Sequence, residues 1–243
     1  MALIDYANPT RFLGFAERVQ PWLIGLTALA LAAGLYLVQG APDDYQQGAT
    51  VKIMFLHVPS AWLSMFGWTV MSVAALGTLV WRHPLADVAA KAAAPLGAAF
   101  TFLCLVTGSL WGRPMWGTYW EWDARLTSVL ILFLMYLGLI ALWRAVEDPS
   151  RAARAAAILT LVGAINLPII KFSVDWWNTL HQPASVMRMG GSSLDKAYLI
   201  PLLVMAIGFS LLFVTLHLAA MRNEILRRRV RSLQMLQASK QAA

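Results

Sequence analysis

The chain has 243 residues, of which 59% are hydrophobic and only 13% are charged, and its formal net charge is +7 at pH 7. Ordinary soluble domains carry about 25% charged residues, so this composition excludes an ordinary soluble domain. The length suits one domain over residues 1–243. The single cysteine, Cys104, excludes an internal disulfide and covalent c-type haem, and the lack of a phosphate-binding Gly-Lys loop excludes ATP hydrolysis by this chain.

Six long apolar runs follow one another along the chain, at about residues 22–38, 57–81, 92–110, 127–143, 155–171 and 197–220. A helix that crosses the hydrocarbon core needs about 20 such residues, with a range of roughly 17–25. No segment alternates with the strand period of a membrane β-barrel. We therefore expect an all-α membrane protein, a polytopic bundle of six transmembrane helices. The first run follows 21 residues and precedes a poor cleavage site, which favours an uncleaved span over a signal peptide.

The distribution of Lys and Arg predicts the orientation of these spans. Thirteen of the 19 basic residues fall on the side that holds the two chain ends, and cytoplasmic segments are the ones enriched in Lys and Arg. Both termini are therefore expected to be cytoplasmic, with three outer loops. Residues 221–243 form a basic cytoplasmic tail, which we expect to be an interfacial helix that contacts anionic lipid. The positive charge thus reports topology and does not indicate nucleic-acid binding.

Residues 111–128, WGRPMWGTYWEWDARLTS, form the most unusual segment, and they fall in the second outer loop. This segment holds four of the eleven tryptophans of the chain and runs directly into Asp123 and Arg125. Trp gathers at membrane surfaces in any case, but four in one short loop exceed what anchoring requires. A flat aromatic surface edged by charge suits a flat, apolar ligand with polar tails. The four residues are Trp111, Trp116, Trp120 and Trp122.

Two histidines share the side and depth of this segment. His57 stands where the first outer loop enters the second span, two residues before a Pro59 that fits the first turn of a helix, and His181 stands in the third outer loop. Imidazole is the commonest metal ligand in proteins and a frequent ligand of haem iron. The residues alone leave a hydrogen-bonding role and a pair of axial haem ligands equally open.

The charged residues beside the segment suit the carboxylates of such a ligand. Arg125 is a candidate for a haem propionate, since guanidinium binds carboxylate with two hydrogen bonds. Lys52 is a second candidate, and we expect Asp123 to orient Arg125 or a Trp N–H.

The stretch WGTYWEWDARLTS resembles the tryptophan-rich "WWD" signature of the haem-handling protein family of cytochrome c maturation. The chain is similar over its whole length to six-span members of that family, which place the signature in the second outer loop between two histidines. The resemblance implies that His57 and His181 are the axial ligands of the haem iron. It also implies a haem-binding segment that comprises Trp111, Trp116, Gly117, Trp120, Trp122, Asp123 and Arg125.

The same resemblance implies binding and transfer of haem b, without enzymatic chemistry. The protein would lie in the bacterial inner membrane, hold haem b at the periplasmic face, and deliver it to the membrane-anchored haem chaperone CcmE during c-type cytochrome biogenesis. The ATP-binding-cassette subunits CcmA and CcmB and the small membrane protein CcmD would complete the complex. Because this chain has no ATP motif, the energy would come from those partners.

Three other functions remain open at the level of sequence. Haem lyases of the CcmF and CcsA group share the signature but are larger and have additional histidines within their spans. A dihaem electron-transfer subunit would use His57 and His181 on the outer side and His83 and His217 on the inner side. A literal transporter would need polar groups at mid-membrane. The main such residue is Asn166, for which an interhelical hydrogen bond is the simpler explanation.

Overall fold

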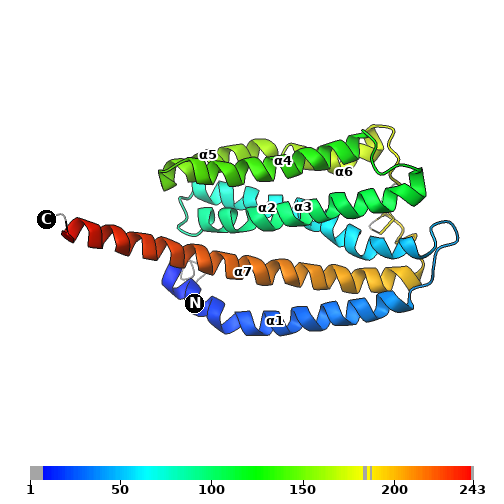
Figure 1. Cartoon of the computed structure of the whole chain (residues 1–243), viewed down its shortest axis with the longest axis horizontal. Helices are drawn as coiled ribbons and strands as arrows, with labels where there is room; N and C mark the ends of the chain where they lie inside the picture. Colours follow the sequence, from blue (N-terminus) through cyan, green and yellow to red (C-terminus); the bar gives the residue numbers. More distant parts are fainter. Residues whose placement is uncertain (1–7, 183–184, 187, 242–243) are drawn as a thin grey trace.

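The computed structural model describes residues 8–182, 185–186 and 188–241, and in these residues the chain folds into helices with their long axes side by side (Figure 1). Six helical stretches are long and apolar enough to cross a membrane, which confirms the all-α class and the expected number of spans. The elements are α1 (Pro9–Gly40), the 3₁₀ helix η2 (Ala49–Ile53), α2 (Met54–Leu79), α3 (Ala86–Trp116), α4 (Ala124–Ala145), α5 (Pro149–Gly163), α6 (Asn166–Trp176) and α7 (Lys196–Gln241).

The helices exceed the expected spans at most of their ends. The helix α2 begins at Met54, so Pro59 lies inside it and does not mark its start. His57 therefore belongs to the first turn of α2. The α3 helix runs on to Trp116, so Trp111 and Trp116 are helical, and only the second half of the Trp-rich segment is a loop.

The fifth span is broken between α5 and α6, at Ala164 and Ile165. The buried amide of Asn166 donates a hydrogen bond to the carbonyl oxygen of Ser128, at 2.9 Å, which confirms the interhelical role expected for it. While α5 packs against both α2 and α4, α6 packs against α4. The two helices of this span thus have different packing neighbours.

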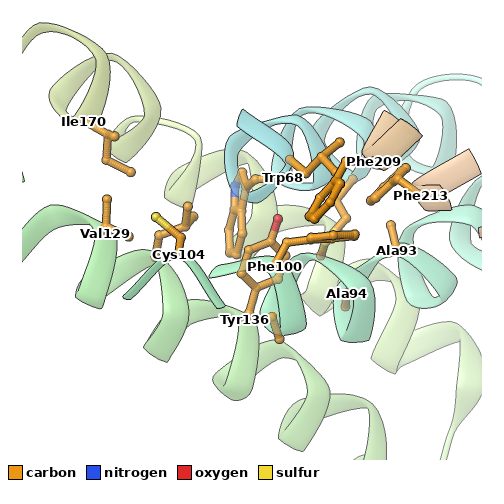
Figure 2. Packing of buried hydrophobic residues seen from close by; sticks show 14 of the residues in the cluster. Trp68, Ala93, Ala94, Phe100, Cys104, Val129, Tyr136, Ile170, Phe209 and Phe213 are labelled. Atoms are coloured by element: carbon orange, nitrogen blue, oxygen red, sulfur yellow. The ribbon is translucent and has the colours of Figure 1, made fainter. Parts of the chain in front are cut away.

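The core fills the middle of the bundle and is built around aromatic side chains (Figure 2). Trp68 donates from Nε1 to the carbonyl oxygen of Thr160, and the Tyr136 hydroxyl donates to the carbonyl oxygen of Ser64. A Cβ at Gly97 would lie 2.2 Å from the Tyr136 ring, so the absence of a side chain there lets α3 and α4 approach closely. Both buried polar groups are satisfied, as an apolar interior requires.

The helix α7 extends well beyond the bundle as a continuous helix of 46 residues (Figure 1). Its half-buried Glu224 pairs with Lys91 and Arg228, and Arg228 also pairs with Asp87, which ties the start of the basic tail to α3. An interfacial helix would turn into the membrane plane. The tail instead continues α7 without a break, a course that differs from the expected helix lying on lipid.

Candidate functional site

A cavity of about 440 Å³ lies among α2, α3, α4, α6 and the loop that follows α6. Its size is within the range of small-molecule pockets, roughly 300–1,000 Å³. Cys104, Val129 and Ile170, at one edge of the packed core, belong to its wall (Figure 2). The wall is largely apolar, and the polar residues that reach it include both outer histidines and Arg125.

His57 enters this cavity from α2 with one ring nitrogen already engaged. Its Nδ1 lies 3.1 Å from the carbonyl oxygen of Cys104 and 3.2 Å from the Thr107 hydroxyl oxygen, both on α3. Because the Cys104 carbonyl oxygen can only accept a hydrogen bond, the proton of the neutral ring lies on Nδ1. The lone pair of Nε2 is then available to a metal ion. A Cβ at Gly108 would lie 2.8 Å from the His57 ring, so glycine there makes room for the imidazole.

His181 is held in the same way, from the loop after α6. Its Nδ1 lies 3.1 Å from Asp123 Oδ2, and the Trp116 ring meets its edge at 4.9 Å between centroids. Burial lowers the pKa of His181, and the adjacent Asp123 carboxylate opposes that shift. The shift favours the neutral imidazole. In that form Nδ1–H donates a hydrogen bond to Asp123, and Nε2 keeps a lone pair for a metal ion.

Asp123 thus has a different partner from the one expected. One carboxylate oxygen caps α4 by accepting from the Leu126 N–H at 2.7 Å, and the other accepts from His181 and from the Leu180 N–H. The sequence placed Asp123 beside Arg125 or a Trp N–H because the path of the third loop could not be read from it. In metal sites, the second nitrogen of a ligating histidine is held by a carboxylate or a backbone carbonyl. Both histidines here have that arrangement.

Replacing Asp123 with asparagine is expected to weaken haem binding about 10- to 100-fold, the usual cost of losing such a partner. Asparagine can still cap the helix and accept a hydrogen bond from the imidazole N–H, but its side chain carries no negative charge. Spectroscopic titration with haem measures the change. Asp148→Asn is the matched control, since Asp148 caps α5 through the Arg151 N–H. Equal affinities for the two variants would contradict this role of Asp123.

The Trp-rich segment is divided between two surfaces. Trp111 and Trp116 line the cavity, and Trp111 donates from Nε1 to Gln47, which brings the first outer loop to the rim. Trp120 and Trp122 are not part of the wall: they pack edge to face, 5.5 Å apart, and Trp122 is 74% exposed. Gly117 ends α3 with a positive φ of 77°, a backbone conformation that favours glycine, so its role is to let the chain turn there.

Two cations reach the cavity, and only one of them was expected. The Arg125 Nε donates to the Ser173 hydroxyl at 3.1 Å, and its guanidinium approaches the Lys171 carbonyl oxygen at 3.4 Å. Lys171 itself lines the cavity. Its position in an apolar run was the signal that sequence reasoning passed over. Lys52 lies outside the wall and pairs with Asp43 at 3.5 Å.

Of the other two histidines, His217 joins α7 to α3, and His83 is exposed in the connection between α2 and α3. His217 Nε2 lies 2.9 Å from the carbonyl oxygen of Ala89, and His83 Nδ1 accepts from the Leu85 N–H at 3.3 Å. Neither belongs to the cavity wall. The geometry therefore favours one site, between His57 and His181, over the paired sites of a dihaem subunit.

Comparison with known proteins identifies the family of this chain. The family Heme exporter protein C matches residues 2–236. The chain is 85% identical over 242 residues to Heme exporter protein C of Bradyrhizobium diazoefficiens, a match that covers 100% of this chain and 92% of that protein. It is 52% identical over 225 residues to Heme exporter protein C of Escherichia coli, covering 92% and 91% of the two chains. The protein of that name in Paracoccus denitrificans is 47% identical over 234 residues, covering 96% and 97%.

Proposed function

Because this chain belongs to the haem exporter protein C family, which serves haem transport in cytochrome c biogenesis, we propose that it binds haem b and hands it to the chaperone CcmE. His57 and His181 supply the two axial ligands of the iron. The observation that carries the proposal is that both imidazoles line one cavity with Nδ1 engaged. Each can therefore offer Nε2 to a metal.

The rest of the wall suits the cargo. Apolar side chains such as Val58, Met65 and Leu105 match the hydrophobic macrocycle, and Trp111 and Trp116 supply flat faces beside the two histidines. Arg125 is placed to bind a carboxylate of the haem edge. Haem is the cargo of this protein and must be released again. Coordination by two histidines is reversible, whereas a covalent link to haem would not be.

We place the site at the periplasmic face of the bacterial inner membrane. The Lys and Arg distribution supports cytoplasmic termini and three outer loops, and the cavity lies where α2 begins and α3 ends. In this orientation the chain forms a single haem-handling domain. The 221–241 part of α7 then reaches into the cytoplasm, on the side where the ATP-hydrolysing subunit CcmA acts together with CcmB and CcmD.

The exposed part of the signature is the proposed docking surface for CcmE. Trp122 lies outside the cavity wall and is exposed, and the half-buried Trp120, also outside the wall, packs against it. Exposed aromatic residues are the common anchors of protein interfaces. The protein then acts by binding and presenting haem, and the chemistry of covalent attachment occurs on the chaperone.

Haem transfer between purified partners tests this function. Haem-loaded protein in detergent is mixed with apo-CcmE, and the haem on each protein is followed by absorption and by denaturing gel. We expect the haem to leave this chain and become attached to CcmE. A chain that binds haem firmly but never supplies CcmE would contradict delivery and would favour a resident haem of an electron-transfer subunit.

Replacing Trp116 or Trp122 with alanine is expected to separate binding from delivery. Trp116→Ala removes a contact of His181 and lowers haem retention. Trp122→Ala leaves haem retention intact but weakens CcmE binding about 30-fold, as the loss of an interface anchor does. Trp81→Ala is the control, because Trp81 is 72% exposed and follows α2 at the other end of the bundle. Equal effects of both signature variants on haem retention would contradict the division.

A further inference from the structure

Lys171 is one of the two charged residues of α6, together with Asp175. It lies in α6, NLPIIKFSVDW, within the fifth membrane span, and it lines the haem cavity. A charged residue in a span is costly unless its head group reaches water or an opposite charge, and such residues usually mark a functional site. Lys171 is exposed to water, and its place in the cavity wall also puts it within reach of a bound ligand.

The described part of the chain supplies no anionic partner for Lys171. Asp175 lies one turn further along α6 and also lines the cavity, yet no carboxylate is within ion-pair distance of the Lys171 ammonium among the described residues. Asp123 is engaged by His181 and by the start of α4. Lys171 thus faces the cavity without a protein counter-ion in these ranges.

A second cation stands beside it. The Arg125 guanidinium donates to the Lys171 backbone carbonyl at 3.4 Å, so the two residues are neighbours, and both reach the cavity. Arg125 contacts only the backbone of Lys171, so the Lys171 ammonium remains available to a second anionic group. Arg125 and Lys171 outnumber the single acid of the wall, Asp175. The wall therefore carries a net positive charge that suits an anionic ligand, with two cations that can each meet one carboxylate.

We propose that Lys171 and Arg125 form a two-point clamp for the two propionates of the haem cargo, Arg125 on one carboxylate and Lys171 on the other. This inference rests on the proposed haem-binding function and adds the selection of the carboxylate edge. The clamp fixes the rotation of the ring about the axis through the two histidines. It thereby sets which edge of the haem is turned away from α6 and toward a partner.

Haem and haem dimethyl ester, in which both propionates are esterified, test the clamp. Affinities of both ligands are measured by spectroscopic titration for the wild-type chain, Lys171→Ala, Lys171→Arg and Lys52→Ala. Lys171→Ala is expected to weaken haem binding roughly five- to tenfold, as the loss of a partly solvated charge-assisted hydrogen bond does. The same variant should bind the dimethyl ester as the wild type does, and Lys171→Arg should retain haem. Lys52→Ala, which removes the same charge outside the cavity, should change neither affinity.

Two outcomes would overturn the clamp. If Lys171→Ala lowered the affinities for haem and for the ester equally, the residue would support the fold of α6. If the haem affinity were unchanged, the Lys171 ammonium would be solvated by water and would not bind a propionate. Both outcomes leave the proposed function standing, because wild-type haem binding through the histidines is measured in the same titration. A wild-type chain that binds neither ligand would instead contradict the proposed function.

Discussion

Alanine at His57 or at His181 is expected to abolish stable haem binding. Loss of a group that merely orients a metal-ligating histidine usually costs 10- to 100-fold in affinity, so loss of the ligand itself should cost at least about 100-fold. The measurement is the haem content and Soret absorption of each purified variant after loading with excess haem. Each single variant should fall to the level of the double variant, because neither imidazole alone fixes the iron.

His83→Ala is the matched control, since His83 lies outside the cavity wall and its Nδ1 accepts from a backbone N–H two residues on. This variant should load as the wild type does. Free imidazole added to His181→Gly should restore part of the Soret band, because the space left by the side chain can admit the missing ligand. A full Soret band in both alanine variants would show that the iron is bound elsewhere.

Gly108→Ala is expected to have the second largest effect, through one added methyl group. Its Cβ would lie 2.8 Å from His57 Cε1, well inside the ordinary contact range of 3.4–4 Å, so the imidazole has to move. The shift displaces an axial ligand, and we expect haem affinity to fall about tenfold or more. The fold should not suffer, because alanine is up to about 1 kcal/mol better than glycine inside a helix.

Gly138→Ala is the control for this substitution. Gly138 lies inside α4, and nothing stands within 4 Å of a Cβ placed there. Thermal unfolding should show both variants at least as stable as the wild type, while only Gly108→Ala loses haem. A Gly108→Ala protein that is stable and binds haem normally would show that the position of the His57 ring is not critical.

The number and order of the spans could be predicted from the sequence because they depend on long apolar runs, and the structure contains them. Their ends could not, because helices continue past the hydrocarbon wherever the chain still forms backbone hydrogen bonds. Trp111 and Trp116 illustrate this: they were expected in a loop and belong to the last turns of α3. The basic tail of α7 continues its span for the same reason.

The roles of His57, His181 and Arg125 were predicted from their place beside the Trp-rich segment and from the family resemblance, whereas the residues that contact them were not predicted. Asp123 caps its own helix and reaches His181, 58 residues away, a pairing that depends on the path of the third loop. Lys171 lies in α6, beyond the break in the fifth span, and its place in the cavity wall depends on how α6 packs against α4. Contacts of this kind are set by tertiary packing and leave no local pattern in the sequence.

The identity of the iron ligands is the central claim, and the spectrum of the haem-loaded wild-type chain tests it most directly. Optical absorption and electron paramagnetic resonance of the ferric form distinguish two histidine ligands from one. The geometry of His57 and His181, with both Nδ1 atoms engaged and both Nε2 atoms available, predicts a low-spin signal of a bis-histidine haem. A high-spin signal, or a chain that remains haem-free when haem is in excess, would contradict it.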